Sequence, residues 1–188
     1  NRQLEHWRAR ARELERQLGD LSELAHVVHQ PDIPVLTTRV IATAPAALGA
    51  TVLLGVGRDH KIVSGHAVMD AGGLVGRVVD ANAQSARVLL ITDHQSRIPV
   101  HVGVARVRAL MMGDDTALPR LDYLPAGTEV KPGDDVVTSG VGGILPRGLR
   151  IGEVVREAGR LAVKPNARLG SLDYITVLLY AAPELELS

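Results

Sequence analysis

The sequence predicts a mainly β protein in which an N-terminal coiled-coil helix precedes two small six-stranded β-barrel-like domains. Three observations support this fold class: an early heptad pattern, a glycine-punctuated strand pattern that occurs twice, and turn signals roughly every 8 to 12 residues without further helical periodicity. Strand and turn spacing alone suits a barrel or a sandwich. The predicted segments are a helix at 1–30, a linker at 31–34, β domains at 35–103 and 104–182, and a polar tail at 183–188.

The predicted helix carries a narrow hydrophobic seam. Its apolar residues recur at alternating intervals of three and four positions: Leu4, Trp7, Ala11, Leu14, Leu18, Leu21, Ala25 and Val28. The other faces are charged, which favours a self-association helix over the alternative, an amphipathic helix packed on its own domain. Pro31 and Pro34 end the helix because proline lacks the amide donor.

The first β domain begins with two segments rich in β-branched residues, 35–43 and 51–56, which we expect to be strands. A strand, a glycine loop and a second strand follow at 62–79, and a further strand is expected at 87–91. The last strand, 97–102, contains Pro99, which predicts an edge strand or a strand start.

The pattern of residues 62–79 returns at 130–155, which predicts two similar β modules. A chance match of short glycine-rich strands is the alternative. In this alignment the strand at 87–91 corresponds to the final strand at 176–180. The equivalent glycines are Gly65 and Gly133, Gly72-Gly73 and Gly142-Gly143, and Gly76 and Gly152.

The loop that contains Gly140, Gly142 and Gly143 is predicted to be structural, with positive φ at one or more of the three. Phosphate binding is disfavoured, because no Gly-Lys-Ser/Thr follows and the next element is a strand rather than a helix. Gly72, Gly73, Gly76 and Gly152 are expected to mark bulges or close backbone approaches.

Composition excludes several function classes. The chain has no cysteine, so it has no disulfide, thiolate metal site or cysteine nucleophile. Its 21 basic and 21 acidic residues balance and aromatics are 2% of the chain, which argues against nucleic acid as a partner. His26 and His29 offer a metal only two ligands, so no metal site and no cofactor is expected.

No catalytic site is predicted. Ser139, with His94 or His101 and with Asp93, supplies the residue types of a hydrolase triad, but a triad is recognised by geometry that a sequence does not show. A turn serine that bonds nearby backbone is the favoured interpretation. We expect binding at free strand edges and aliphatic patches instead of in a pocket.

Four segments, 72–79, 86–93, 132–149 and 151–154, resemble the rod shape-determining protein MreC family in its periplasmic region. The resemblance implies an inner-membrane protein whose membrane anchor precedes Asn1, with a coiled coil leading to a periplasmic body. It also implies a scaffold of the peptidoglycan synthesis machinery that elongates rod-shaped cells (the elongasome).

By the same resemblance, the expected partners are the elongation-specific penicillin-binding protein, MreD, RodA and MreB, together with further copies of the chain in dimers or filaments. The predicted function is therefore a non-enzymatic scaffold that maintains cell shape. A serine hydrolase on paired β-barrels and a peptidoglycan-binding module are the alternatives.

Overall fold

The computed structural model describes residue 10 and residues 33–44 and 50–181. The chain divides into two units, Asn1–Asp32 and Ile33–Ser188, and the fold below is that of the second unit. The predicted tail at 183–188 lies outside the described residues. All eight residues of the predicted seam lie outside the described residues as well: Leu4, Trp7, Ala11, Leu14, Leu18, Leu21, Ala25 and Val28. None of the helices described is both long and apolar enough to cross a bilayer.

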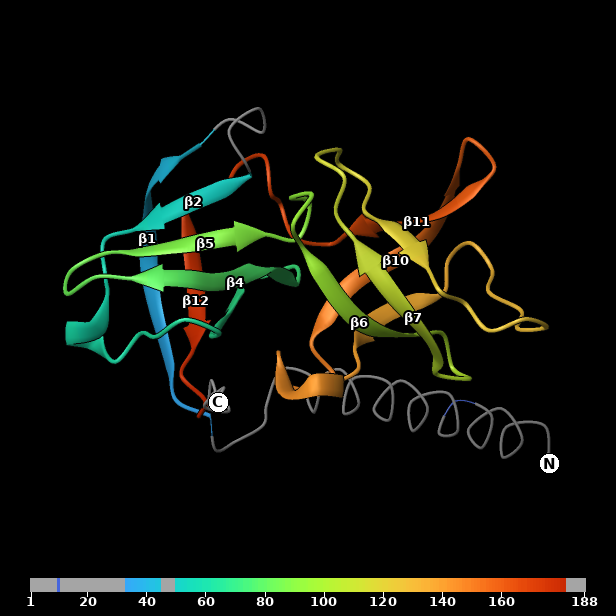
Figure 1. Cartoon of the computed structure of the whole chain (residues 1–188), viewed down its shortest axis with the longest axis horizontal. Helices are drawn as coiled ribbons and strands as arrows, with labels where there is room; N and C mark the ends of the chain where they lie inside the picture. The colour runs from blue at the N-terminus through green and yellow to red at the C-terminus, as the bar shows by residue number, and fades with distance from the viewer. Residues whose placement is uncertain (1–9, 11–32, 45–49, 182–188) are drawn as a thin grey trace, which may run out of the picture. The chain divides into compact units, whose positions relative to one another are not determined.

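The second unit contains two closed six-stranded barrels (Figure 1). This confirms the predicted mainly β class and resolves the choice between barrel and sandwich. The first barrel has the strand order β1-β12-β3-β4-β5-β2, and all its neighbouring strands are antiparallel. Its strands are β1 (Val35–Thr43), β2 (Thr51–Leu54), β3 (Ala67–Met69), β4 (Leu74–Ala81), β5 (Ala86–Leu90) and β12 (Tyr174–Leu178).

The second barrel has the order β10-β11-β8-β7-β6-β9, also antiparallel throughout. Burial alternates along β6, where Ile98, Val100 and Val102 face the core while Pro99 and His101 face outward, as a period of two requires. Its strands are β6 (Arg97–Val102), β7 (Val107–Met112), β8 (Arg120–Asp122), β9 (Asp135–Thr138), β10 (Arg150–Glu157) and β11 (Arg160–Pro165). Two 3-10 turns are described as well, η2 (Arg58–His60) in the first barrel and η3 (Val141–Gly143) in the second.

The predicted division at 103/104 was wrong for two strands. β6 belongs to the second barrel, where it pairs with β7 and β9. β12 belongs to the first barrel, where it pairs with β1 and β3 and closes the sheet. The second barrel is therefore an insertion between β5 and β12 of the first. Apart from the β6–β7 hairpin, these pairings join residues far apart in the chain, which local strand patterns do not reveal.

The expected docking at free strand edges was also wrong, because closure of a barrel removes its edges. Pro99 lies on an interior strand, with β7 on one side and β9 on the other. Its carbonyl accepts a hydrogen bond from the Ser139 N–H at 3.0 Å. In this register Ser139 lies opposite Pro99, one residue beyond the end of β9, so the missing donor of the proline falls at the end of the β6–β9 ladder.

The internal repeat is present in the backbone hydrogen bonds. The Gly65 N–H donates to the Val78 carbonyl and the Gly133 N–H donates to the Val154 carbonyl, both at 2.8 Å. Both glycines have positive φ, 99° and 93°. Gly76 and Gly152 are equivalent too, since an added Cβ would lie 2.0 Å from a neighbouring-strand carbonyl oxygen in each case.

The repeat unit differs from the prediction at its last strand. β3, β4 and β5 of the first barrel correspond to β9, β10 and β11 of the second, because β5 and β11 pair in the same way with β4 and β10. The counterpart of 87–91 is therefore β11 and not the final strand at 176–180. Residues 88–90 and 177–179 both read Val-Leu-Leu, and this shared motif caused the error.

Candidate interaction site

The two barrels are fused where the β3–β4 turn meets the second barrel. A Cβ on Gly72 would lie 2.1 Å from the Asn166 carbonyl oxygen, and one on Gly73 would lie 2.8 Å from that of Arg150. Both positions need glycine for space, since backbone atoms cannot move aside as a flexible side chain can. Leu74 and Ile91 of the first barrel are buried in the core of the second, so the junction is a continuous core.

Asp70 holds this junction by three backbone hydrogen bonds. Its Oδ1 accepts from the Gly72 and Gly73 N–H groups at 2.7 and 2.9 Å. Its Oδ2 accepts from the Arg168 N–H at 2.8 Å, in the segment that leads out of the second barrel. One carboxylate thus links the β3–β4 turn to a residue 98 positions away. The sequence analysis did not identify Asp70, although an aspartate before a Gly-Gly turn is a usable signal.

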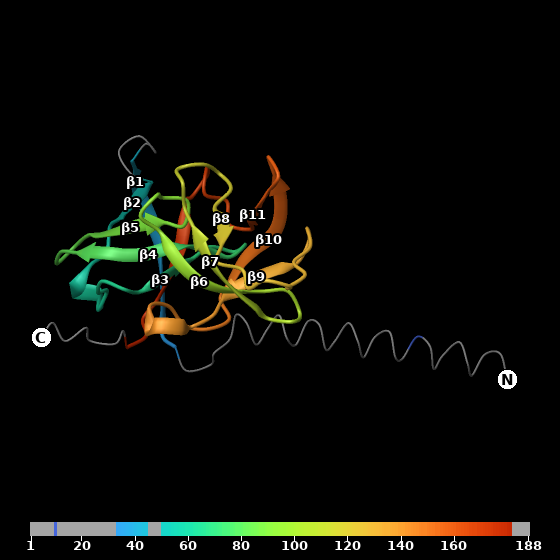
Figure 2. The same cartoon turned by 45° about the vertical axis from the view of Figure 1, so that its right-hand side comes forward.

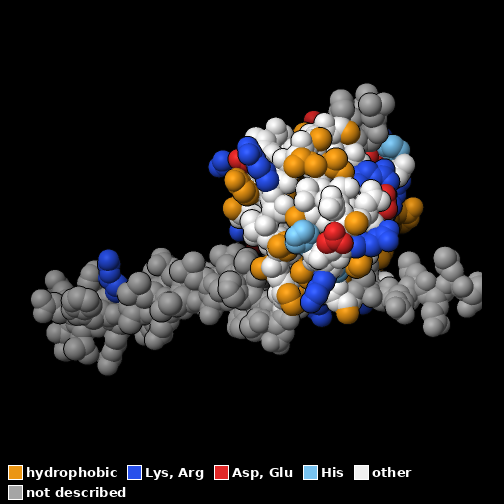
Figure 3. Space-filling model, turned by 90° about the vertical axis from the view of Figure 1, so that its left-hand side faces the viewer, with side chains coloured by type: hydrophobic (Ala, Val, Ile, Leu, Met, Phe, Trp, Pro, Cys, Tyr) orange, Lys and Arg blue, Asp and Glu red, His pale blue; other side chains and the backbone are white. Residues whose placement is uncertain are grey.

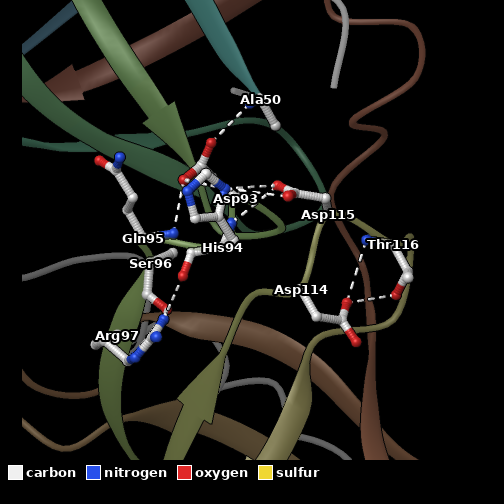
Figure 4. A network of polar contacts seen from close by, with 9 residues as sticks. All are labelled: Ala50, Asp93, His94, Gln95, Ser96, Arg97, Asp114, Asp115 and Thr116. Carbon is white, nitrogen blue, oxygen red and sulfur yellow. Dashed lines mark hydrogen bonds and ion pairs between the residues drawn. The ribbon is translucent and has the colours of Figure 1, made fainter. Parts of the chain in front are cut away.

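A second polar network lies where the chain passes from β5 to β6 (Figure 4). Asp93, 1% exposed, accepts from the Ala50 N–H through Oδ2 and from the Gln95 N–H through Oδ1, both at 2.7 Å. Nearby, His94 Nδ1 lies 3.0 Å from Asp115 Oδ2. Ligand atoms of Asp93, His94 and Asp115 lie within 4.8 Å of one another. Because backbone N–H groups already satisfy both oxygens of Asp93, this cluster is accounted for without a metal.

The glycine loop joins β9 to β10 in the second barrel. Gly140 and Gly142 have φ of 75° and Gly143 has φ of 64°, which agrees with the conformational reason for expecting glycine there. The base of the loop is fixed by Thr138, whose Oγ1 donates to the Pro146 carbonyl at 2.6 Å and accepts from the Leu149 N–H at 2.8 Å.

The tip of the glycine loop exposes apolar side chains. Val141 is 52% exposed and Ile144 is 40% exposed. The backbone turns sharply at three glycines and the two side chains are left in solvent, an arrangement suited to contact with a protein surface. We call Val141 and Ile144 the loop tip.

The described residues do not assemble the alternative catalytic triad. Ser139 is 7% exposed, and its Oγ accepts a hydrogen bond from the Val141 N–H at 3.2 Å. The His94 ring pairs with Asp115, and His101 Nδ1 is buried without a hydrogen-bond partner in the described structure. Ser139 is thus a turn serine, in the role favoured from the sequence.

A buried histidine and a tyrosine fasten the end of the first barrel to the glycine loop. His66, 3% exposed, accepts from the Val63 N–H at Nδ1 (3.4 Å) and donates from Nε2 to the Tyr180 carbonyl (2.9 Å). The Tyr180 hydroxyl donates to the Gly65 carbonyl and lies 3.4 Å from the Ile144 carbonyl oxygen. Burial lowers the pKa of His66, against a smaller raising effect from Tyr180, and burial raises the pKa of Tyr180 to about 12.

The first barrel also exposes apolar side chains, on β1 and β12: Val35 is 57% exposed, Ile41 58% and Tyr174 62%. They alternate with polar pairs, such as Arg39 and Asp173 at 3.1 Å. In the space-filling view, hydrophobic, basic and acidic side chains are interspersed on the visible face, and no deep hollow opens there (Figure 3).

The described residues thus form a β protein of two closed six-stranded barrels that share a core (Figure 2). The family described as "Rod shape-determining protein MreC, barrel core" matches residues 40–179. The chain therefore belongs to the MreC family, as the sequence resemblance predicted.

Relatives and solved structures agree with this assignment. The chain is 38% identical to a cell shape-determining protein MreC of Caulobacter vibrioides over 95% of its length and 52% of the relative's. It is 39% identical to the MreC of Cereibacter sphaeroides over 94% and 59%. It thus spans little more than half of these relatives. A crystal structure of MreC from Pseudomonas aeruginosa superposes with a TM-score of 0.69 at 30% identity, covering 77% of this chain and 98% of that one.

Two more distant neighbours share the fold. One is the major periplasmic domain of the cell shape-determining filament MreC, with a TM-score of 0.68 at 23% identity over 78% of this chain and 98% of that one. The other is from a complex between penicillin-binding protein PBP2 and MreC of Helicobacter pylori, with a TM-score of 0.57 at 18% identity over 76% and 98%.

Proposed function

We propose that this chain is a non-enzymatic periplasmic scaffold of the cell-wall elongation machinery. It maintains rod cell shape by binding the elongation-specific penicillin-binding protein and by self-assembly. The observation that carries the proposal is membership of a cell shape-determining family, seen in the match to the barrel core and in the 38% identity to the Caulobacter protein. An anchor in the inner membrane and contacts with MreD, RodA and MreB belong to the same proposal.

The described surface supports a binding role. The loop tip offers two exposed apolar side chains, and the barrel that carries it is joined to the other by the Asp70 hydrogen bonds. The Helicobacter relative forms a complex with PBP2, which supports a penicillin-binding protein as the partner class. Closed barrels leave side-chain surfaces and loops for this contact, because their backbone edges are already paired.

Partner binding is tested with the periplasmic domain of the penicillin-binding protein and the full chain, by surface plasmon resonance. The variant Val141→Asp, Ile144→Asp should bind roughly tenfold or more weakly, since charges replace apolar contacts at the loop tip. Tyr123→Asp is the matched control: Tyr123 is 78% exposed in the same barrel, and aspartate tolerates its φ of 60°. Equal binding by wild type and the loop-tip variant would place the contact elsewhere.

Self-assembly is proposed to act through the helix seam. Burying a leucine contributes about 1.5 to 3 kcal/mol, so Leu14→Asp with Leu18→Asp should abolish pairing of the helices. Sedimentation analysis at several concentrations measures this, and an unchanged mass in the double variant would remove the seam from the proposal.

A further inference from the structure

Positive side chains gather on the outer surface of β6 and β7. His101 and Arg108 are direct cross-strand partners, so their outward-facing side chains are neighbours. Arg106 lies in the turn between the two strands, and both arginines are exposed. Because β6 and β7 alternate in burial, the buried residues of these strands face the core, and His101 and Arg108 lie on the outer face together with the partly exposed Pro99 and Leu110.

The glycine loop adds a third arginine to this surface. β9 lies beside β6, with Val137 paired to His101, and the Ser139 N–H bonds to the Pro99 carbonyl at 3.0 Å. The loop therefore leaves β9 next to β6. A Cβ on Gly140 would lie 2.9 Å from the Cβ of Arg147, which places the two arms of the loop against each other. We call His101, Arg106, Arg108 and Arg147 the basic face.

The basic face is not neutralised within the described structure. The pKa of His101 is lowered by burial and then by the charges of Arg147, Arg106 and Arg108, so all three guanidinium groups act on the ring. No carboxylate contributes to this shift. The ion pairs found among the described residues use other arginines and lysines.

The acidic residues on the elements next to the basic face form no ion pair with it in the part of the chain that the structure describes. The Asp134 carboxylate accepts from the Lys131 N–H within its own turn. Asp135 is exposed at the start of β9, where its carbonyl accepts from the Gly103 N–H, and Asp122 lies on β8 opposite Leu110. Among the described residues, neither carboxylate forms an ion pair with an arginine of the basic face. Three exposed arginines thus lie around a half-buried histidine, and none of the three has an ion-pair partner among the described residues.

We propose that the basic face binds an acidic segment of a protein partner, with carboxylates on Arg108 and Arg147 and an apolar side chain against the loop tip. The inference deepens the proposed scaffold function and rests on it, since it names the chemistry of the partner surface. Guanidinium groups match carboxylates in a two-pronged geometry. Val141, 52% exposed and six residues from Arg147, supplies the apolar contact beside them.

A protein partner fits this surface better than a lipid membrane. Proteins that rest on membranes use tryptophan, phenylalanine or long apolar side chains at the interface. The chain has no phenylalanine and its single tryptophan, Trp7, lies far from the barrels in sequence. The loop tip offers a valine and an isoleucine on a tight turn, a size suited to a pocket or groove on a protein.

The test measures the binding of a synthetic peptide of alternating glutamate and leucine to the full chain, with NMR and fluorescence anisotropy as the two methods of detection. The peptide should bind, and raising NaCl from about 50 to about 300 mM should weaken it severalfold through screening. Each of Arg108→Glu and Arg147→Glu should weaken binding roughly tenfold. Arg156→Glu should change it less than about twofold, because Arg156 lies at the far end of β10, paired with Leu161 of β11 and separated from β6 by β9.

His101 reports the site independently of affinity. Its pKa, followed through the ring proton shifts, should rise when the peptide binds, and it should rise in Arg108→Glu without any ligand. A matched lysine-leucine peptide and phosphatidylglycerol vesicles are the competing probes. If a charge-reversal variant does not fold, Arg108→Gln and Arg147→Gln replace it.

The proposal is overturned by a glutamate peptide that fails to bind, by equal binding to wild type and the Arg108→Glu, Arg147→Glu variant, or by vesicles that bind where the peptide does not. It is separable from the scaffold function. A penicillin-binding protein domain that binds wild type and the charge-reversal variant equally would leave the scaffold function standing and remove the basic face from it.

Discussion

Gly72-Gly73 and Gly142-Gly143 occupy equivalent places in the two modules but serve opposite purposes. Neither Gly72 nor Gly73 has positive φ, and backbone atoms of the second barrel lie where their side chains would be. Gly142 and Gly143 do have positive φ, and a Cβ on Gly142 would approach nothing closer than the Ile144 side chain at 3.8 Å. The first pair is needed for space and the second for backbone conformation, so identical residues at a repeated position carry different costs of substitution.

Substitution of Gly72 gives the largest expected effect. Gly72→Ala places a methyl group 2.1 Å from the Asn166 carbonyl oxygen and forces the barrels apart. We expect a loss of about 3 kcal/mol or more in unfolding free energy, above the usual cost of an overpacked core. Urea denaturation monitored by circular dichroism measures this. A loss below about 1 kcal/mol would show that the junction relaxes easily.

Loss of the Asp70 carboxylate tests the polar half of the junction. Asp70→Ala leaves three backbone N–H groups without their acceptor and should cost about 2 kcal/mol. The control is Asp134→Ala in the second module, because Asp134 bonds only within its own turn among the described residues, to the Lys131 N–H. Equal losses in both variants would contradict a special role for Asp70 in joining the barrels.

Substitution in the glycine loop should cost less than substitution at the junction. Gly142→Ala has room for its methyl group but keeps a φ of 75°, so we expect a loss of about 1 kcal/mol. Urea denaturation under the same conditions compares this loss in unfolding free energy with that of Gly72→Ala. A larger loss for Gly142→Ala than for Gly72→Ala would reverse the comparison of the two turns.

The modules also differ at the residue that follows the equivalent positive-φ glycines, Gly65 and Gly133. This residue is His66 in the first module and Asp134 in the second. Burial lowers the pKa of His66, so the unfolded chain binds a proton more readily than the folded one. The contribution is fully present above about pH 6.5, the ordinary histidine value, and is lost as pH falls below it. Unfolding free energies at pH 7.5 and pH 5 should show a smaller fall for His66→Gln than for wild type. Identical falls would show that the pKa of His66 is the same in the folded and unfolded chain.

Much of the fold could be predicted because it depends on short-range patterns. The strand predicted at 97–102 is present as β6. The spacing of Gly65 and Gly133 predicted equivalent turns that share the same hydrogen bonds. The glycines of the β9–β10 loop predicted positive φ. In each case steric limits on a few consecutive residues determine the conformation, whatever the rest of the chain does.

The tertiary structure decided the features that depend on residues far apart. Strand β12 shares Val-Leu-Leu with the strand at 87–91, yet it lies between β1 and β3 and closes the first barrel, because its partners are strands far away in the sequence. Asp70 reaches Arg168, and Tyr180 reaches Gly65, across 98 and 115 positions. The basic face combines two strands and a loop. Local preference sets the strands and turns of this protein, whereas barrel closure and burial of a shared core determine which of them meet.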